Sequence, residues 1–185
     1  MFNPISYTKT FCMTKLFLIP IASLLLAACT DNDKKEDDAS KKNADMQALY
    51  EKNLAGLKKS ISAFENKDIE GWAANIADTA RWDSPAYGDT VHTKAHWKES
   101  LAYYLANWDN LKLNNSTFLP GIDSATHDLD GSVRYYGNWD ATHKSGLKTS
   151  VNFYGTYDFN TDNKIISGSE FFDVGGLMNA VTPKK

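Results

Sequence analysis

The sequence predicts an α+β fold in which helices cover one face of an antiparallel sheet. Residues 133–178 alternate apolar and polar side chains around the turn Asn160-Thr161-Asp162-Asn163, a pattern typical of antiparallel strands joined by hairpins. The region before them instead repeats apolar residues at helical spacing. A sheet with one aromatic face needs helices to bury that face, so the segregation of helices from strands favours the α+β class.

Length and composition indicate one ordinary globular domain with accessory segments. The chain has 185 residues, of which 42% are hydrophobic and 23% charged, as in a typical soluble core. Its formal net charge of -3 gives no electrostatic footprint for nucleic acid. Aromatic residues make up 12% of the chain, which suits a core or an apolar pocket.

Residues 1–28 are predicted to be a signal peptide. An uncharged apolar run, residues 16–28, follows Lys15; it fits the hydrophobic region of a signal peptide and is shorter than the roughly 20 residues that cross a bilayer. The run ends in Leu26-Ala27-Ala28-Cys29, which resembles the lipobox of bacterial lipoproteins. That resemblance implies cleavage before Cys29 and acylation (palmitate-type) of the cysteine. The alternative is a plain signal peptide in which Cys29 lies near the cut.

The cysteine count supports a lipid anchor at Cys29. The other cysteine, Cys12, lies upstream of the apolar run and is expected to be removed with the signal. The mature domain then has no thiol for a disulfide, a metal site or a nucleophile. Two or three acyl chains anchor a protein stably to a membrane. Met13 is an alternative start to Met1, because MTKLFLIP is a more usual opening for a signal peptide.

Residues 29–45 are predicted to be the lipidated cysteine followed by a disordered tether. Residues 30–45 contain no apolar residue beyond alanine and mix acids with lysines, so they cannot bury enough surface to fold. Thr30, rather than Asp, follows Cys29, so the inner-membrane retention signal known from enteric lipoproteins is missing. A cell-envelope protein anchored in the outer membrane is therefore expected, with the periplasmic and the surface face both open.

Three helices are expected before the main sheet. The first, residues 46–66, has one apolar stripe at steps of three and four. Asp68 is positioned to cap a short second helix, residues 69–77, and Thr93 to cap a third, residues 94–108. The stripe of the third helix consists of Trp97, Leu101, Tyr104, Leu105 and Trp108.

Strands are expected at residues 79–87, at residues 111–119 and in the region that begins at Val133. In that region two runs of alternate residues each share one face of the sheet: Val133, Tyr135, Gly137 and Trp139 in one strand, and Val151, Phe153, Gly155, Tyr157 and Phe159 in the next. No internal repeat is visible. Residues 46–185 are therefore expected to form a single domain.

The order of these elements resembles the SnoaL-like branch of the nuclear transport factor two-like superfamily. Three stretches carry the resemblance: Phe64 to Pro85, the helix from Thr93 to Leu105, and the strands from Val133 to Met178. The resemblance implies a curved antiparallel sheet wrapped by three N-terminal helices into a cone, a cystatin-like α+β roll, with a pocket at its wide end. Homodimers packed through the sheet are common in such families.

Asp173 is the first candidate for catalysis. It follows the last strand, shares a face with Ser169 and Phe171 by alternation, and precedes Gly175-Gly176. In the polyketide cyclases that the chain resembles, an aspartate on the final strand is the general acid/base, and Asp173 looks like the matching position. An aspartate in an aromatic pocket has a raised pKa, which suits proton transfer near neutral pH. The alternative is a capping aspartate that closes the strand.

His143 is the second catalytic candidate. Its Thr-His pair resembles one that faces the pocket in SnoaL-like proteins, but a solvent-exposed hairpin tip explains it equally well. Residues expected to line the pocket and bind a ligand are Trp72, Trp82, Asp83, Tyr87, Tyr104, Trp108, Trp139, Phe153, Tyr157 and Phe171. The spacing of His92 and His96 invites a zinc interpretation, but no glutamate lies between them, and no metal or cofactor is expected.

Two functions follow from this sequence. The first is an envelope lipoprotein whose domain binds a small apolar molecule or a partner protein. The second is an enzyme of the cyclase, isomerase or hydratase kind, with Asp173 as acid/base. Fold alone does not choose between them. A convergence of an acid and a second polar group inside one pocket would favour the enzyme.

Overall fold

A computed structural model describes residues 30–182 of the chain, and side chains from residue 38 onward. The chain divides into two units, Met1–Asp37 and Asp38–Lys185, and the fold below is that of the second. The signal peptide, Cys12, the alternative start at Met13 and the lipobox cysteine Cys29 lie outside the described residues. No helix within residues 30–182 is long and apolar enough to cross a membrane.

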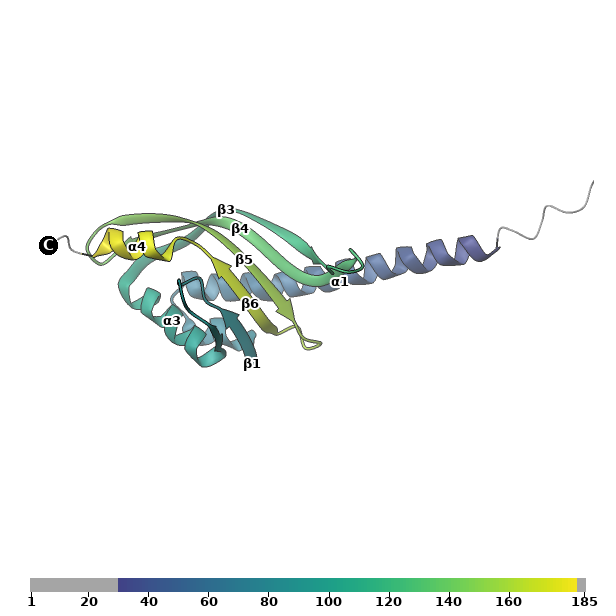
Figure 1. Ribbon diagram of the computed structural model, residues 1–185, viewed down its shortest axis with the longest axis horizontal. Coiled ribbons are helices and arrows are strands. Elements are labelled where there is room, and N and C mark those ends of the chain that lie inside the picture. The colour runs from purple at the N-terminus through teal and green to yellow at the C-terminus, as the bar shows by residue number, and fades with distance from the viewer. Residues whose placement is uncertain (1–29, 183–185) are drawn as a thin grey trace, which may run out of the picture. The chain divides into compact units, whose positions relative to one another are not determined.

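Four helices and six strands make up the described chain (Figure 1). In chain order they are α1 (Thr30–Glu65), α2 (Ile69–Ala74), β1 (Ile76–Asp83), β2 (Val91–Thr93), α3 (Lys94–Asn107), β3 (Trp108–Ile122), β4 (Leu129–His143), β5 (Lys148–Phe159), β6 (Ile165–Phe171) and α4 (Val174–Val181). The predicted α+β class is confirmed. The C-terminal helix α4 was not among the predicted elements.

The strands form one curved sheet in the order β2-β1-β6-β5-β4-β3. Neighbouring strands are antiparallel, as predicted, except that β1 and β6 pair in parallel. Strand β1 lies between β2, which follows it in the chain, and β6, the last strand of the chain. The parallel pairing of β1 with β6 places Trp82 directly opposite Gly168.

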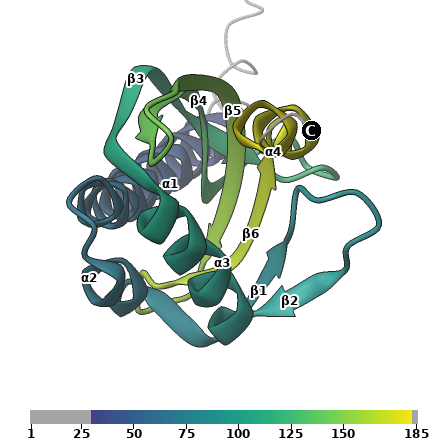
Figure 2. The same cartoon turned by 90° about the vertical axis from the view of Figure 1, so that its left-hand side faces the viewer.

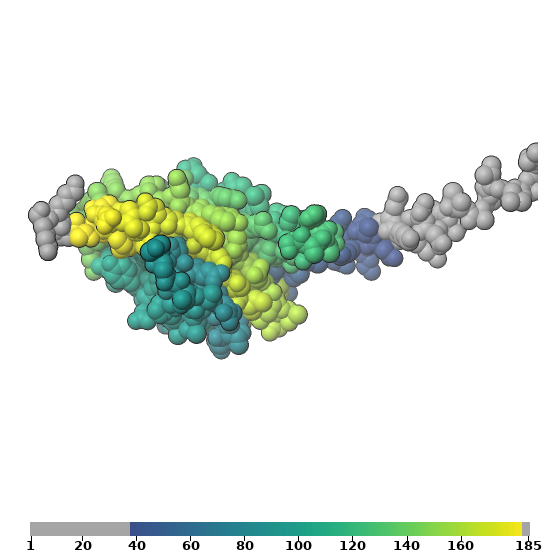
Figure 3. All heavy atoms as spheres, viewed as in Figure 1, coloured from purple at the N-terminus to yellow at the C-terminus, as the bar shows by residue number. Residues whose placement is uncertain are grey.

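Helices α1, α2 and α3 lie on the concave side of the sheet (Figure 2). Their apolar residues pack against the aromatic faces of β4 and β5. In β4, Val133 and Tyr135 are buried on this face, whereas Tyr136, on the opposite face, is exposed. The alternation read from the sequence is thus confirmed in both strands. Helix α4 lies over one end of the sheet (Figure 3), where Leu177 packs against Trp108 and Leu111.

The predicted caps differ in how they act. Asp68 caps α2, since its side chain accepts a hydrogen bond from the backbone N–H of Gly71 at 2.8 Å. Thr93 is the N-cap residue of α3 in extended conformation, but its side chain makes no capping hydrogen bond. Helix α3 is instead held by Trp97, which is 1% exposed and packs between Trp72 and Trp82.

Residues 30–45 are helical in the structure, in contrast to the disordered tether expected there. They extend α1 toward its N-terminus, and the segment contains neither proline nor glycine to stop a helix. The described side chains of this segment, residues 38–45, are all exposed. They are therefore solvated as expected, and Lys42 reaches across to Asp128 at 2.6 Å.

Candidate functional site

The concave side of the sheet holds a pocket of about 510 Å³. Helices α1 to α4, the loop after β1 and the inner faces of strands β3 to β6 all contribute to its walls. Most of the lining is apolar. Of the residues predicted to bind a ligand, seven line this pocket: Trp72, Trp82, Tyr104, Trp108, Trp139, Phe153 and Tyr157.

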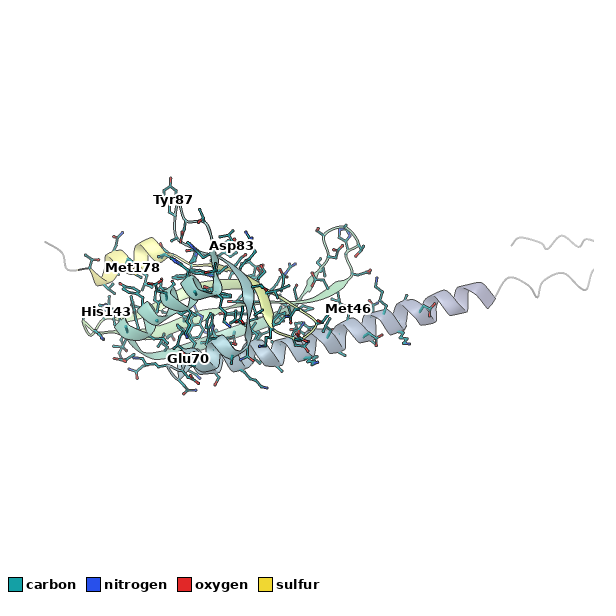
Figure 4. All side chains as sticks on the ribbon, turned by 90° about the horizontal axis from the view of Figure 1, so that it is seen from below. Met46, Glu70, Asp83, Tyr87, His143 and Met178 are labelled. Atoms are coloured by element: carbon teal, nitrogen blue, oxygen red, sulfur yellow. The ribbon has the colours of Figure 1, made fainter. Side chains whose placement is uncertain are left out.

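The other three predicted ligand-binding residues lie outside the pocket lining. Phe171 is 55% exposed on the opposite face of the sheet, where it stacks on Tyr154. Asp83 is on that face too and accepts a hydrogen bond from the Ser169 hydroxyl at 2.8 Å. Tyr87 is fully exposed at the tip of the loop after β1 and projects from the body of the unit (Figure 4).

The two predicted catalytic residues do not converge in the pocket. Asp173 is exposed and caps α4, its carboxylate accepting a hydrogen bond from the Gly176 backbone N–H at 2.7 Å. His143 ends β4 and its Nδ1 lies 2.9 Å from the Ser145 hydroxyl within the hairpin turn. Neither residue lines the pocket. The geometry therefore assigns them capping and turn roles and does not support the predicted acid/base role of Asp173.

Glu170 is the acid inside the pocket, and sequence reasoning missed it. It lies on β6, is 8% exposed and lines the cavity. Its Oε1 accepts a hydrogen bond from the Tyr157 hydroxyl at 3.1 Å, and its Oε2 accepts one from the Trp82 indole N–H at 3.2 Å. The three side chains come from β1, β5 and β6, so the curvature of the sheet and the parallel β1–β6 pair create this cluster.

Burial raises the pKa of Glu170 from its ordinary value of 4.5 to about 7. Loss of hydration disfavours the charged carboxylate, and hydrogen bonds from Tyr157 and Trp82 offset only part of that penalty. Trp97 also lowers this pKa, although its indole N–H makes no hydrogen bond of normal geometry. Glu170 is therefore poised to exchange a proton near neutral pH.

The hydroxyl of Tyr135 and the indole N–H of Trp139 extend this polar cluster along the pocket wall. The Trp139 indole N–H donates to the Tyr135 hydroxyl at 3.3 Å. The Tyr135 and Tyr157 rings stack at 5.9 Å between centroids. Burial raises the pKa of both tyrosines, and the nearby Glu170 raises it further. Both hydroxyls stay protonated at neutral pH and can serve as hydrogen-bond donors to Glu170 or to a ligand.

A second polar group of side chains lies where the loop after β1 meets α3. His92 Nε2 is 2.5 Å from Asp89 Oδ1, and the His92 ring stacks on His96 at 3.9 Å between centroids. Hydrogen bonds from the Ser84 hydroxyl, the Thr90 backbone and His92 lower the pKa of Asp89 to about 2. Both imidazoles lie near the Trp82 ring, which links this group to Glu170.

No metal-binding group is formed by these histidines. Within residues 38–182, the side chains of His, Cys, Asp and Glu do not assemble into any set of three or more that could hold a metal ion. The stacked rings of His92 and His96 face each other rather than converging on one point.

Three comparisons relate the chain to known proteins. No protein-family model matches it, and no curated protein matches it. Solved structures do. A candidate isomerase from Bacillus subtilis is 17% identical, with a TM-score of 0.56 over 67% of this chain and 88% of that one. A candidate polyketide cyclase from Xanthomonas campestris pv. campestris is 12% identical, with a TM-score of 0.59 over 72% and 99%.

Two further structures name the fold. A candidate SnoaL-like polyketide cyclase from Shewanella denitrificans is 10% identical, with a TM-score of 0.53 over 69% of this chain and 94% of that one. A nuclear transport factor two-like protein of unknown function from Burkholderia pseudomallei is 17% identical, with a TM-score of 0.56 over 71% and 98%. At these identities the likeness concerns the fold: the chain has the nuclear transport factor two-like fold in the form seen in SnoaL-like proteins.

Proposed function

We propose that the domain binds a small, largely apolar substrate in its pocket and moves a proton on it, with Glu170 as general acid/base. The observation that carries this proposal is a single carboxyl group buried in an apolar pocket with a pKa of about 7. A group whose pKa lies near the working pH is the most effective proton-transfer catalyst. The proposal replaces Asp173 with Glu170 in the role expected from the sequence.

The geometry fits a reaction in which a proton leaves one substrate atom and returns to another. Ionised Glu170 accepts the proton, and the Tyr157 and Trp82 donors hold its carboxylate in place. The neutral hydroxyl of Tyr135 lies on the same wall and is available to a developing negative charge on substrate oxygen. Solved structures of the same fold are named as candidate cyclases and a candidate isomerase, reaction classes that depend on such transfers.

The probe 5-nitrobenzisoxazole tests Glu170 as a base. A base removes its ring C–H proton, the ring N–O bond breaks, and a coloured nitrophenolate forms. We expect the protein to accelerate this ring opening above buffer at about pH 8, and Glu170→Gln to lose at least about tenfold of that acceleration. Glu99→Gln is the matched control, because Glu99 also lines the pocket but is exposed. Equal rates for both variants would refute the proposal.

A second candidate function is ligand binding without chemistry. It is favoured by the fact that each oxygen of Glu170 already has a protein donor, as in a purely structural carboxyl group. In that case the neutral fluorophore N-phenylnaphthylamine binds wild type and Glu170→Gln equally, and neither protein accelerates the ring opening. Trp108→Ala, which removes a large wall residue, weakens binding of the fluorophore under either function.

We also propose that lipid on Cys29 holds the domain at the cell envelope, in the outer membrane. The proposal rests on the sequence Leu26-Ala27-Ala28-Cys29 after an apolar run. The mass of the mature protein purified from its native membrane tests it, with Cys29→Ser as control. A chain that starts at Cys29 and carries acyl groups, lost in the control, supports the anchor; an unmodified chain cut elsewhere refutes it.

We propose, finally, that a second copy of the domain packs on the outer face of the sheet. Tyr136, Tyr154 and Phe171 form a ladder across β4, β5 and β6 there, with ring centroids 4.6 Å and 5.7 Å apart. Tyr136 and Phe171 are 47% and 55% exposed. Sedimentation of wild type and Phe171→Lys tests the pairing: a dimer that becomes a monomer in the variant supports it, and a monomeric wild type refutes it.

A further inference from the structure

The ionisable side chains of the pocket are almost all acidic. Asp89, Glu99 and Glu170 line it, and neither lysine nor arginine occurs among the lining residues. His96 is the only lining residue with a basic side chain. The other titratable groups of the lining are tyrosines, which are neutral near pH 7. A ligand in this pocket therefore meets negative charge at neutral pH and no permanent positive charge.

The two lysines of helix α3 bind partners outside the pocket lining. Lys94 and Lys98 are on α3, the helix that also carries His96 and Glu99 into the lining. Lys94 donates to the Ile76 carbonyl and to the Asp78 carboxylate at 2.8 Å each. Lys98 pairs with Glu70 at 2.6 Å. Helix α3 thus presents its acid to the pocket and its bases to α2 and β1.

Glu170 has no cationic partner of its own. Tyr157 and Trp82, the side chains that hydrogen-bond it, are neutral donors. An ionised carboxylate in such surroundings lacks the opposite charge that normally accompanies a buried ion. A positively charged group brought by a ligand would supply it.

From this arrangement we propose that the pocket takes an organic amine, as a protonated or alkylated ammonium group on an apolar body, with the ammonium group paired to Glu170. The proposal deepens the function proposed above and rests on the same pocket being the ligand site. It assigns the chemical class of the ligand, which the proton-transfer role alone leaves open.

Three physical effects select a cation here. An ammonium group that leaves water needs a carboxylate as partner, and charge-assisted hydrogen bonds to a carboxylate are the strong ones. The aromatic rings of the lining carry negative charge on their faces, which attracts organic cations and repels anions. A carboxylate or phosphate ligand would instead lose its hydration beside Glu170 and Glu99, with neither lysine nor arginine in the lining to pair with it. Anionic molecules of the same size are therefore excluded.

Three probes that share one apolar body test the charge preference: naphthylmethylamine, naphthylmethanol and naphthoate. Each is titrated against N-phenylnaphthylamine bound to the protein, at about pH 8, where Glu170 is ionised. We expect the amine to bind at least about tenfold more tightly than the alcohol, and the naphthoate most weakly. In Glu170→Gln the amine should lose that advantage, while the affinity for the alcohol should stay within about twofold.

Glu99→Gln and Asp89→Asn serve as matched controls, because they remove the exposed carboxylates of the lining and leave the buried one. Loss of the amine preference in these variants but not in Glu170→Gln would overturn the pairing. Tighter binding of the alcohol or of naphthoate in wild type, or no binding of any probe, would overturn the ligand class.

Failure of this proposal differs from failure of the proposed catalysis. Glu170-dependent opening of 5-nitrobenzisoxazole without an amine preference would leave the acid/base role standing and refute the ligand class. An amine preference that depends on Glu170, without any ring opening, would support the ligand class and refute the acid/base role.

Discussion

The raised pKa of Glu170 predicts that the protein loses stability as the pH rises, and that Glu170→Gln abolishes this loss. Below about pH 4.5 the carboxyl is protonated in both the folded and the unfolded chain and costs nothing. As the pH rises toward 7, the unfolded chain releases its proton first, because its pKa is the lower one, and this favours unfolding. Above about pH 7 both states are ionised and the cost is constant.

The size of the effect follows from the two pKa values. Glu170 titrates near 7 in the fold against an ordinary value of 4.5, and one pKa unit corresponds to about 1.4 kcal/mol, so the cost is roughly 3 kcal/mol. Glutamine is close in shape to the protonated acid. Its carbonyl can accept from the Trp82 N–H, and the Tyr157 hydroxyl can rotate to accept from its amide, so the substitution keeps the local packing.

Urea denaturation followed by tryptophan fluorescence, between about pH 4.5 and 8, measures the effect. The free energy of unfolding of Glu170→Gln minus that of wild type should rise by roughly 3 kcal/mol across this interval. Taking the difference cancels the aspartates whose pKa is lowered, such as Asp78 and Asp89. Glu99→Gln, the exposed control, should give a flat difference. A flat difference for Glu170→Gln as well would refute the reasoning.

Three further predictions follow from the same structure. Gly155→Ala should destabilise the fold by about 1–3 kcal/mol in urea denaturation, because its new Cβ would lie 2.8 Å from the Tyr157 ring and 2.9 Å from the Phe153 ring. Gly175→Ala is the control, since a Cβ there would lie 3.8 Å from its nearest neighbour. A loss of stability in Gly155→Ala no larger than in Gly175→Ala would contradict this prediction. Asp173→Ala should remove the cap of α4 and cost about 1 kcal/mol, yet leave the opening of 5-nitrobenzisoxazole within about twofold of wild type; a larger loss of rate would restore Asp173 as a catalytic candidate. Trp82→Phe removes the N–H that stabilises the ionised Glu170, so the pH midpoint of the ring-opening rate should move upward; a downward shift would show that this hydrogen bond has been misjudged.

The residues of β4 and β5 that share one face of the sheet could be predicted from the sequence because strand alternation has a strict period of two. Val133, Tyr135 and Trp139 share one face of β4, and Phe153 and Tyr157 share one face of β5, as the period predicts. The helical stripes were also readable from apolar spacing, except that Trp108, expected at the end of the third helix, is the first residue of β3. Seven of the ten predicted ligand-binding residues line the pocket for this reason.

The acid of the pocket was missed because alternation says which residues share a face, and not which face points inward. Ser169 and Phe171 do share one face, but it is the outer one. Two consecutive phenylalanines, Phe171 and Phe172, make either choice equally apolar. The inward face of β6 is settled by pairing: Gly168 leaves room for Trp97, whose ring would lie 2.4 Å from a Cβ there, and Glu170 follows two residues later.

Helix α4 was missed because Gly175-Gly176 is more typical of a turn than of a helix. The structure shows why glycine is needed at the second position. A Cβ on Gly176 would lie 2.1 Å from the Asp173 carboxylate, which bonds the Gly176 N–H and starts the helix. Asp173 and the glycine pair thus form a helix cap together. A capping role for Asp173 was one interpretation of the sequence, but its hydrogen bond with the Gly176 N–H was not evident without the fold.

The most direct test of Glu170 as acid/base is the pH dependence of the 5-nitrobenzisoxazole reaction. Because the ionised carboxylate is the active form, the rate above buffer should rise with pH along a single titration curve with its midpoint near the pKa of about 7. Glu170→Gln should abolish that curve, and Glu99→Gln should keep it. A midpoint near the ordinary value of 4.5, or the same curve in Glu170→Gln, would contradict the role assigned to this residue.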